Sequence, residues 1–556
     1  MRFQLVQTEW YRALASAMAS AGVSDVVLSP GSRSTPVVLA TVAEPRLHVL
    51  PVWDERSAAF LALGMARRSG RPTVLVRTSG SAAGHDLPAV MEADMACVPL
   101  LVLSADRPPE LVGSGASQTA DQAKLFGDKV RGYFELGLPD AEGIDGVFRK
   151  VAQAVALSKG PTPGPVHINA PARKPLEPVE PADEVEATLH ARVDQRIQRP
   201  LRIQAAQPRF GPAAFATAAD HVAHARRGLL VAGPARGRPP LASAARFLEE
   251  SRFVFAAELS SGLTSLGGLE AYEHSPGPDA PDIVVCLGAQ PTSLRLQSMV
   301  RSADRVVMLD PWRPLDPSNR AEHVFVGPLD EALMGLSRAA LRDDGYARDR
   351  QGFRDDWENL DRACGERLNA KLQRRTLAED GGVVRRLLRA LPEDGLLILG
   401  NSSSIRLADR FGRIGLGRKS FQVASQRGLA GIDGNISAGL GSALEHEGPT
   451  CVLLGDVAFA HDLNGLCLLE QAQRPFVVCV LDNGGGRIFD ELPIARSAPE
   501  LMPLFRTPTG LDIEAACRAF GVNYRRLDGE EVLQDALSTQ AATVLHARVE
   551  MIHELA

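Results

Sequence analysis

Short runs of β-branched and aliphatic residues alternate with longer amphipathic stretches from one end of the chain to the other. This alternation predicts strands that are each followed by a helix, and such units build parallel sheets covered by helices. A chain of 556 residues is too long for one hydrophobic core, so we expect several domains. The predicted fold class is therefore α/β, with three domains that each contain a mainly parallel sheet flanked by helices.

The predicted strands fall into three groups along the chain. They are residues 25–29, 73–78, 99–104 and 165–169, then 228–232, 282–287 and 305–309, and finally 395–399, 450–454, 476–481 and 543–549. A proline-rich, charged stretch over about 170–200 is typical of a linker. These groups predict domains over residues 1–185, 195–342 and 343–556.

The composition argues against several classes of protein. Apolar residues make up 45% and charged residues 23%, as in ordinary globular proteins. The formal charge of −6 is small for this length and no basic tract contains interleaved aromatic residues, so we expect no nucleic-acid partner. There is no long apolar run and no signal-peptide core, so we expect no membrane association. The seven scattered cysteines form no Cys-x-x-Cys pair and predict buried, reduced thiols in a cytoplasmic protein.

Two consecutive predicted strands near the C-terminus end in residues that suit a hard cation. Asp456 follows the strand over 450–454, and Asn483 follows the strand over 476–481 together with three glycines. A carboxylate and an amide oxygen beside exposed backbone are typical ligands of a magnesium ion that holds a diphosphate. Two ordinary strand-to-loop turns would explain the same residue types, because Asp, Asn and Gly are common in turns.

Arginine recurs in three of the predicted loops. Arg33 lies between a strand and a helix start, where backbone N–H groups and the helix dipole already favour an anion. Arg406 and Arg427 lie in two loops of the last third. A single arginine is usually a solvated surface charge, but three in such loops predict a substrate with several carboxylates.

Five segments in the outer thirds of the chain are specific in combination. They are Ser29-Pro-Gly-Ser-Arg-Ser-Thr-Pro36, Asp54-Glu-Arg-Ser-Ala58, Ser104-Ala-Asp-Arg-Pro-Pro-Glu110, Arg427-Gly-Leu-Ala-Gly-Ile-Asp-Gly434 and Asp462-Leu-Asn-Gly-Leu466. In this order they resemble the thiamine diphosphate enzymes of the pyruvate oxidase and acetolactate synthase type. Among these enzymes they are most similar to the menaquinone-pathway family of synthases that make 2-succinyl-5-enolpyruvyl-6-hydroxy-3-cyclohexene-1-carboxylate. The resemblance covers essentially the full length and is weakest in the middle third.

The resemblance implies a transferase that decarboxylates 2-oxoglutarate with thiamine diphosphate and joins the product to isochorismate. It implies a pyrimidine-binding first domain, a central domain and a diphosphate-binding last domain. It also implies Mg²⁺, with Mn²⁺ as an alternative, and a homodimer or homotetramer whose active sites lie at the subunit interface.

The resemblance also assigns roles to residues by position. A lone glutamate in a first helical turn is commonly only a partner of the helix dipole, but Glu55 would support the imino tautomer of the aminopyrimidine. The metal would be held by Asp456, Asn483 and the backbone oxygen of Gly485. The other cofactor contacts would come from Thr78, Ile432, Phe489 and Leu492.

The substrate contacts follow in the same way. The carboxylates derived from 2-oxoglutarate would lie near Ser402, Arg406 and Arg427. Isochorismate would be held by Ser32, Arg33, Arg107, Ser117 and Gln118. The resemblance gives a catalytic part to Gln118, Ser402, Arg406 and Arg427, beside Glu55.

Three positions depart from the family pattern. Ser117 stands where the family often has Asn, Leu294 where it often has Lys, and Asp482 where Asn usually precedes the metal-binding Asn. These departures leave the thiamine chemistry intact and bear on the isochorismate subsite. Two alternatives stay open: another thiamine diphosphate-dependent 2-oxo acid decarboxylase or ligase, and a non-catalytic homologue that acts as a regulatory or scaffolding subunit.

Overall fold

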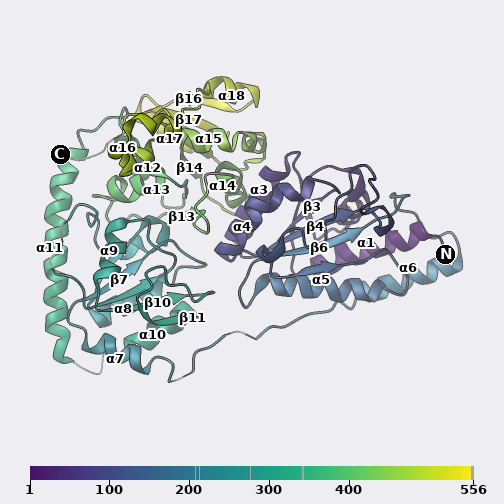
Figure 1. Ribbon diagram of the computed structural model, residues 1–556, viewed down its shortest axis with the longest axis horizontal. Helices are drawn as coiled ribbons and strands as arrows, with labels where there is room; N and C mark the ends of the chain where they lie inside the picture. The colour runs from purple at the N-terminus through teal and green to yellow at the C-terminus, as the bar shows by residue number, and fades with distance from the viewer. Residues whose placement is uncertain (207, 212, 276, 278, 341–343, 552–556) are drawn as a thin grey trace. The chain divides into compact units, whose positions relative to one another are not determined.

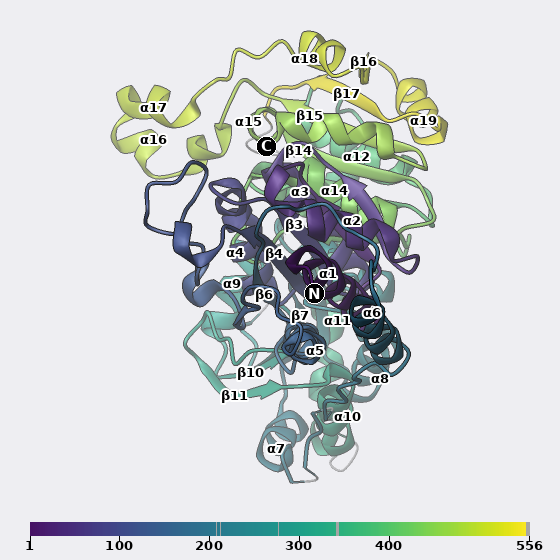
Figure 2. The same cartoon turned by 90° about the vertical axis from the view of Figure 1, so that its right-hand side faces the viewer.

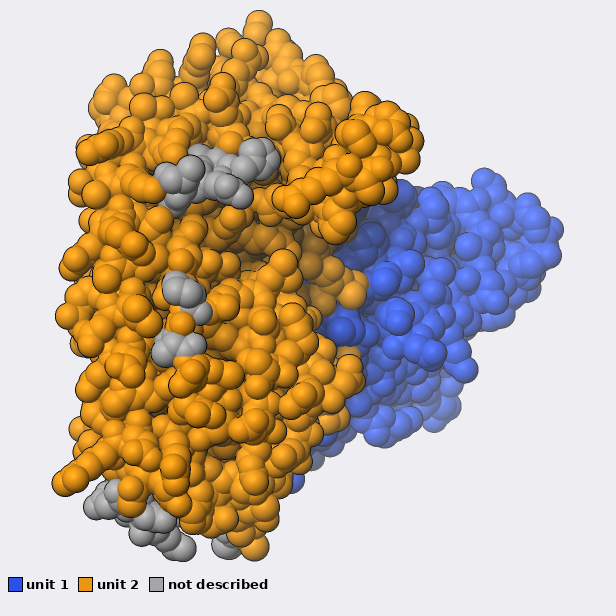
Figure 3. All heavy atoms as spheres, turned by 60° about the vertical axis from the view of Figure 1, so that its left-hand side comes forward, with its two compact units in different colours: residues 1–207, 436–445 blue, residues 208–435, 446–556 orange. Residues whose placement is uncertain are grey.

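The computed structural model describes residues 1–206, 208–211, 213–275, 277, 279–340 and 344–551. Three parallel sheets follow one another along the chain, which confirms the predicted α/β class (Figure 1, and turned by 90° in Figure 2). The chain divides into two compact units (Figure 3). Unit 1 comprises residues 1–207 and 436–445, and unit 2 comprises residues 208–435 and 446–556. The predicted domain boundary at 342/343 lies outside the described residues, and the predicted domain bounds stay a prediction.

The first sheet lies in unit 1 and has the strand order β2-β1-β3-β4-β6-β5. Its strands are β1 (Asp25–Leu28), β2 (His48–Pro51), β3 (Thr73–Arg77), β4 (Leu100–Asp106), β5 (Tyr133–Glu135) and β6 (Pro165–Pro171). One face packs on α1 (Phe3–Ser20), α2 (Thr35–Ala43) and α5 (Ile144–Lys159). The sheet is also contacted by α3 (Glu55–Ser69) and α4 (Leu87–Ala96). The interior strands are buried along their whole length, which explains their continuous apolar sequence.

The stretch predicted to be a linker contains helix α6 (Glu184–Ile197). Leu189 and Val193, four residues apart, join the core between the first sheet and α1. Arg2 forms an ion pair with Glu186 at 2.6 Å and ties this helix to the N-terminus. The linker prediction is wrong over these residues, because it weighed the proline and charge content above the helical spacing of the apolar residues.

The second sheet lies in unit 2 and has the order β11-β10-β9-β7-β8. Its strands are β7 (Gly228–Ala232), β8 (Val254–Ala257), β9 (Ile283–Leu287), β10 (Arg305–Asp310) and β11 (Ala321–Val326). One face packs on α7 (Ala216–His224), α8 (Leu241–Ser251) and α10 (Leu329–Ala340). The other face packs on α9 (Leu294–Ser302) and the first half of α11 (Ala347–Leu372).

The third sheet, also in unit 2, has the order β13-β12-β14-β15-β17-β16. Its strands are β12 (Leu396–Leu399), β13 (Gln422–Ser425), β14 (Thr450–Gly455), β15 (Phe476–Asp482), β16 (Asn523–Arg526) and β17 (Thr543–Arg548). The second half of α11, α12 (Asp380–Ala390) and α19 (Glu530–Ser538) share a core with it. Shorter helices connect the strands: α13 (Ser403–Leu407), α15 (Asp456–His461), α16 (Ile494–Ser497), α17 (Met502–Arg506) and α18 (Ile513–Ala519).

Helix α14 (Asn435–Leu444) follows β13 in the sequence, yet nearly all of it belongs to unit 1, where it packs against α3. The two helices approach at glycines. A Cβ atom on Gly441 would lie 2.0 Å from the carbonyl oxygen of Leu61, and one on Gly64 would lie 2.1 Å from that of Ala438. The two backbones are therefore in direct contact, which only glycine permits at these positions.

The strands predicted from the sequence are the interior strands of the three sheets. The strands that were not predicted are the edge strands β2, β5, β8, β11, β13 and β16. The seven cysteines form no disulfide with one another; six of them are buried, as predicted, and Cys467 is half-buried. Within the described parts of the chain, we find no helix long and apolar enough to cross a membrane.

Candidate active site

Two neighbouring strands of the third sheet bring Asp456 and Asn483 to the same end of the sheet, at the carboxyl ends of its strands. Strands β14 and β15 run parallel with Gly455 opposite Leu481, so both residues follow directly at the carboxyl ends. Asp456 is 5% exposed, and its Oδ2 accepts a hydrogen bond from the backbone N–H of Gly485 at 2.7 Å. The Oδ1 atom of Asn483 is buried and has no hydrogen-bond partner among the described residues. A buried carboxylate and a buried, unpartnered amide oxygen at one edge fit a hard cation.

Gly485 has the backbone conformation that this sheet edge requires. Its φ is +120°, and a Cβ atom there would lie 2.3 Å from the carbonyl oxygen of Arg506. Its own carbonyl oxygen accepts a hydrogen bond from the N–H of Arg487 at 2.8 Å and keeps a second lone pair. Burial raises the pKa of the Asp456 carboxyl, and the neighbouring Asp482 raises that pKa further.

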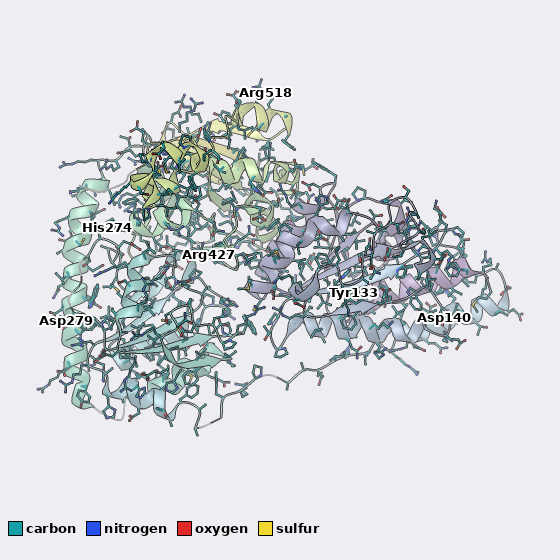
Figure 4. The ribbon with its side chains drawn as sticks, viewed as in Figure 1. Tyr133, Asp140, His274, Asp279, Arg427 and Arg518 are labelled. Atoms are coloured by element: carbon teal, nitrogen blue, oxygen red, sulfur yellow. The ribbon has the colours of Figure 1, made fainter. Side chains whose placement is uncertain are left out.

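A second group of site residues lies in the loops after β12 and β13. Arg427 (labelled in Figure 4) donates from Nη1 to Oδ1 of Asn401 at 2.8 Å, and Arg406 donates from Nη1 to the carbonyl oxygen of Ser402 at 2.6 Å. Ser402 adopts a φ of +66°, a conformation that non-glycine residues rarely adopt. The structure thus brings Ser402, Arg406 and Arg427 together, because Arg427 contacts Asn401 and Arg406 contacts Ser402, the next residue.

Asn401 links the two loops, a part that the sequence reasoning did not assign to it. Its Nδ2 donates to the carbonyl oxygens of Gln426 at 2.9 Å and Gly431 at 2.7 Å, while its Oδ1 accepts from Arg427. An amide at a strand end, directly after a glycine, is the one sequence signal that could have singled it out.

The predicted apolar cofactor contacts lie on separate segments of unit 2. Ile432 is half-buried, and its carbonyl oxygen accepts from Asn435 Nδ2 at 2.7 Å, just before α14. Phe489 packs on Phe505 with ring centroids 5.6 Å apart, and Leu492, 44% exposed, lies three residues further on. Phe489 and Leu492 therefore share one segment after Gly485, whereas Ile432 lies in the loop that follows Arg427.

The unit 1 residues predicted to bind substrate gather at the carboxyl ends of β1, β3 and β4. The backbone N–H of Arg33 donates to Thr78 Oγ1 at 3.2 Å, next to Ser32. Arg107 donates to the carbonyl oxygens of Gln118 at 3.4 Å and Ser117 at 3.1 Å. The structure therefore places these five predicted residues in one region of unit 1, together with Thr78, which was predicted to contact the cofactor.

Arg33 and Arg107 bring two guanidinium groups together, with Asp106 as their acidic neighbour. Arg33 is 5% exposed; its Nη1 donates to the carbonyl oxygen of Ala172 at 2.6 Å, while its Nε has no hydrogen-bond partner among the described residues. Burial lowers the pKa of Arg33, and the charge of Arg107 lowers that pKa further. In the described parts of the chain, neither guanidinium has a carboxylate oxygen within 4.0 Å. Two such groups at strand ends suit an anionic ligand.

Glu55 is the first residue of α3, and the groups behind it are buried. Asp54 caps the helix by accepting from the N–H of Arg56 at 3.0 Å. Arg77 donates from Nη2 to the carbonyl oxygen of Glu55 at 3.1 Å and from Nε to Asp86 at 2.8 Å. Arg77 and Asp86 are both fully buried, and burial raises the pKa of Asp86 to about 6. Asp86, which the sequence reasoning did not single out, thus fixes the side chain that holds the backbone of Glu55.

The departures from the family pattern have different surroundings. Asp482 Oδ2 lies 2.8 Å from Nε2 of His546, whose Nδ1 lies 3.0 Å from the hydroxyl of Tyr524, so this carboxylate belongs to a network across β15, β17 and β16. Leu294 is 74% exposed at the first residue of α9. Ser117 is exposed and offers its carbonyl oxygen to Arg107.

Comparison with known proteins adds to this geometry. Residues 9–125 match the family model described as the thiamine pyrophosphate enzyme, N-terminal TPP binding domain. A protein of Sorangium cellulosum named 2-succinyl-5-enolpyruvyl-6-hydroxy-3-cyclohexene-1-carboxylate synthase is 37% identical over 98% of this chain and 93% of its own length. A protein of the same name from Halorubrum lacusprofundi is 37% identical over 94% of this chain and 89% of its own. This chain belongs to the 2-succinyl-5-enolpyruvyl-6-hydroxy-3-cyclohexene-1-carboxylate synthase family.

Membership of this synthase family confirms the resemblance inferred from the five sequence segments. The fold agrees with it, since the crystal structure of benzoylformate decarboxylase from Polynucleobacter necessarius matches with a TM-score of 0.70 at 15% identity, over 97% of this chain and 98% of that one. The roles of individual residues in a synthase of this family stay predictions for this chain.

Proposed function

We propose that the chain decarboxylates 2-oxoglutarate and joins the remaining four-carbon unit to isochorismate, giving 2-succinyl-5-enolpyruvyl-6-hydroxy-3-cyclohexene-1-carboxylate and CO2. The observation that carries the proposal is the pair of arginine sets in a chain of this family. Arg33 and Arg107 lie in unit 1, and Arg406 and Arg427 lie in unit 2. Both substrates carry two carboxylates, so each arginine set would bind one dianion.

The cofactor proposal rests on the edge of the third sheet. Thiamine diphosphate, when bound, supplies the carbon nucleophile and the electron sink that loss of CO2 requires. The unpartnered oxygen of Asn483, at the same end of the sheet as Asp456, which directly follows β14, supports a divalent cation that holds the diphosphate. We propose Mg²⁺, with Mn²⁺ as an alternative, held by Asp456, Asn483 and the backbone oxygen of Gly485. The remaining contacts to the cofactor would come from Thr78, Ile432, Phe489 and Leu492.

Glu55 would accept a hydrogen bond from the aminopyrimidine and so stabilise the tautomer that takes up a proton. Its backbone is fixed by the buried Arg77–Asp86 pair, which keeps the first turn of α3 in place. A carboxylate held in this way would need no reorganisation during the proton transfer.

The polar residues around each arginine set would orient the substrates. Isochorismate would be held by Ser32, Arg33, Arg107, Ser117 and Gln118. The carboxylates of 2-oxoglutarate would be held by Ser402, Arg406 and Arg427. Because the second step joins two anions, neutralisation by fixed guanidinium groups contributes to orientation as well as to affinity.

We also propose that the protein works as a homodimer or homotetramer with its active sites at the subunit interface, as the family resemblance implies. Light scattering of the purified protein would give the oligomeric state. A monomer that retains full activity would contradict this part of the proposal.

The test follows the loss of isochorismate absorbance in the presence of purified protein, thiamine diphosphate, Mg²⁺ and 2-oxoglutarate, with each component omitted in turn. We expect consumption only when all are present. Release of CO2 from 2-oxoglutarate with isochorismate untouched would favour another thiamine diphosphate-dependent decarboxylase. No reaction of either substrate would favour a non-catalytic homologue.

A further inference from the structure

Two acidic side chains that have no role in the proposed function are buried together in unit 2. Glu258 follows β8 and is 0% exposed, and Asp409 lies in the π-helical turn η8 (Ala408–Gly412) and is 3% exposed. The N–H of Leu259 donates to Oδ1 of Asp409 at 2.8 Å, which brings the two acidic residues together. We call Glu258 and Asp409 the carboxyl pair.

Each member of the carboxyl pair has one satisfied oxygen and one that is not. Glu258 Oε1 accepts from Thr292 Oγ1 at 2.6 Å and from the N–H of Ser293 at 2.8 Å. The other oxygens, Oε2 of Glu258 and Oδ2 of Asp409, are buried without a hydrogen-bond partner among the described residues. Two fully ionised carboxylates would leave both of these charged oxygens desolvated and unpaired, which is strongly unfavourable.

The surrounding charges favour one negative charge on the pair rather than two. Burial raises the pKa of both carboxyl groups, and the charge of Glu258 raises that of Asp409 further. Arg413, which is 3% exposed, stabilises ionised Asp409, and Arg427 stabilises ionised Glu258; Glu273 opposes ionisation of Asp409. Tyr272 is buried beside them as a neutral phenol, since burial raises its pKa well above the ordinary value.

We propose that Glu258 and Asp409 share one proton, so that the neutral carboxyl of one donates a hydrogen bond to the carboxylate of the other. Like-charged carboxyl groups in one buried site behave in this way because they cannot both ionise cheaply. A shared proton pairs the two oxygens that otherwise lack partners.

The carboxyl pair would also act as a positioning device. Turn η8, which contains Asp409, continues directly from α13, which carries Arg406. Glu258 directly follows β8 of the second sheet. The carboxyl pair therefore joins the segment of Arg406 in the third sheet to the end of β8 in the second. Ionisation of both carboxyl groups would weaken that join. The shared proton does not depend on the proposed function, whereas the effect on Arg406 as a substrate ligand rests on it.

The first experiment counts protons. The folded protein holds the shared proton at neutral pH and the unfolded chain does not, so this site lowers the folding constant about tenfold per pH unit as pH rises above about 5. In Glu258→Gln and in Asp409→Asn, an amide N–H replaces the proton. We therefore expect unfolding of either variant to release one proton fewer than unfolding of the wild type. The matched control is Asp282→Asn, whose oxygens accept from the backbone N–H groups of Arg226 and Arg227.

Difference infrared spectra of the folded proteins give a second measure. We expect the C=O stretch of one protonated carboxyl group to disappear in Glu258→Gln and equally in Asp409→Asn, and to remain in Asp282→Asn. Loss of one proton in each single variant, with no further loss in the double variant, supports sharing. A band that persists in either variant, additive losses in the double variant, or a wild-type stability that needs a monovalent cation would overturn the proposal.

Steady-state kinetics test the positioning role. We expect the KM for 2-oxoglutarate to rise with pH by up to about tenfold per unit once the pair ionises, with kcat unchanged. The amide variants should show a flat KM. The same rise in wild type and variants would reject the positioning role. Absence of any 2-oxoglutarate turnover in the wild type would instead count against the proposed function and leave the proton count standing.

Discussion

Glu55 is held in position by the cap residue Asp54 and by the buried Arg77–Asp86 pair. We predict that Glu55→Gln lowers kcat by about 10²–10⁴-fold, because an amide cannot accept the proton that the aminopyrimidine must share. Circular dichroism should show an unchanged fold. Glu142→Gln, at an exposed position of the same unit, is the control; near-normal turnover of Glu55→Gln would remove its assigned role.

The two arginine sets should separate the two substrates. We predict that Arg33→Ala raises the KM for isochorismate about 10–100-fold, because a charge-assisted hydrogen bond contributes about 1.5–3 kcal/mol. The KM for 2-oxoglutarate should change little in this variant. Arg406→Ala should show the opposite pattern. Equal effects on both substrates in either variant would mean that the subsites are wrongly assigned.

His167, on β6, sets a pH limit on the stability of unit 1. The ring is 0% exposed, its Nε2 lies 2.7 Å from Ser104 Oγ, and burial lowers its pKa to about 4. The unfolded chain takes up a proton near pH 6.5 while folded His167 stays neutral. Its contribution is therefore present above pH 6.5, and the free energy of unfolding should fall by about 3 kcal/mol as pH drops toward 4.

Denaturant unfolding of the wild type and of His167→Asn between pH 4.5 and 7 measures this contribution. Unfolding of the variant should take up one proton fewer than unfolding of the wild type, since the amide does not titrate. Parallel curves for the two proteins would show that His167 has no such effect.

At the scale of elements, the success of sequence reasoning followed position in the sheet. Interior strands such as β3 and β14 are buried on both faces and therefore appear as continuous apolar runs. Edge strands such as β2 and β16 are exposed at their end residues and only half-buried between, so no periodic signal marks them. Strand β8 is the exception, because it is fully buried and was still missed; two of its four residues are alanine, which gives only a weak strand signal.

The contact between α3 and α14 makes a sharp prediction for glycine. Gly441→Ala should lower the free energy of unfolding by about 1–3 kcal/mol, because the new methyl group would meet the carbonyl oxygen of Leu61 at 2.0 Å. Gly352→Ala in α11 is the control: its Cβ meets nothing within 4 Å, and the helix should gain about 0.5–1 kcal/mol. A variant Gly441→Ala as stable as the wild type would show that the helices can move apart freely.

At the scale of the whole molecule, sequence motifs pointed to candidate site residues at strand ends and to none of the residues that support them from distant parts of the chain. Arg33, Asp456 and Asn483 lie at the ends of apolar strands, where motif and position agree. Asp409 and the chain next to Glu258 meet across 150 residues of sequence, so no local pattern relates them. Residues that position other residues only through tertiary contacts have no characteristic spacing in the sequence. Polar residues directly after an apolar strand can be recognised from the sequence.

Cofactor binding should stabilise the whole protein. We predict that thiamine diphosphate with Mg²⁺ raises the Tm of the wild type, since a ligand that binds only the folded state stabilises it by about 2.7 kcal/mol at 100 times its Kd. A chelator should reverse the rise. Asn483→Ala should lose most of the shift, and Asn523→Ala, an exposed residue of β16, should keep it. An undiminished shift in Asn483→Ala would exclude this residue as a metal ligand.

Helix α14 has a consequence for synthesis on the ribosome. Unit 1 takes α14 from a part of the chain that is made only after residues 208–435. At a translation rate of about 5–20 residues per second, the surface of α3 around Gly64 stays uncovered for on the order of ten seconds or more before α14 is made. During that time this face of α3 lacks its packing partner, and this interval is when the chain would most need a chaperone.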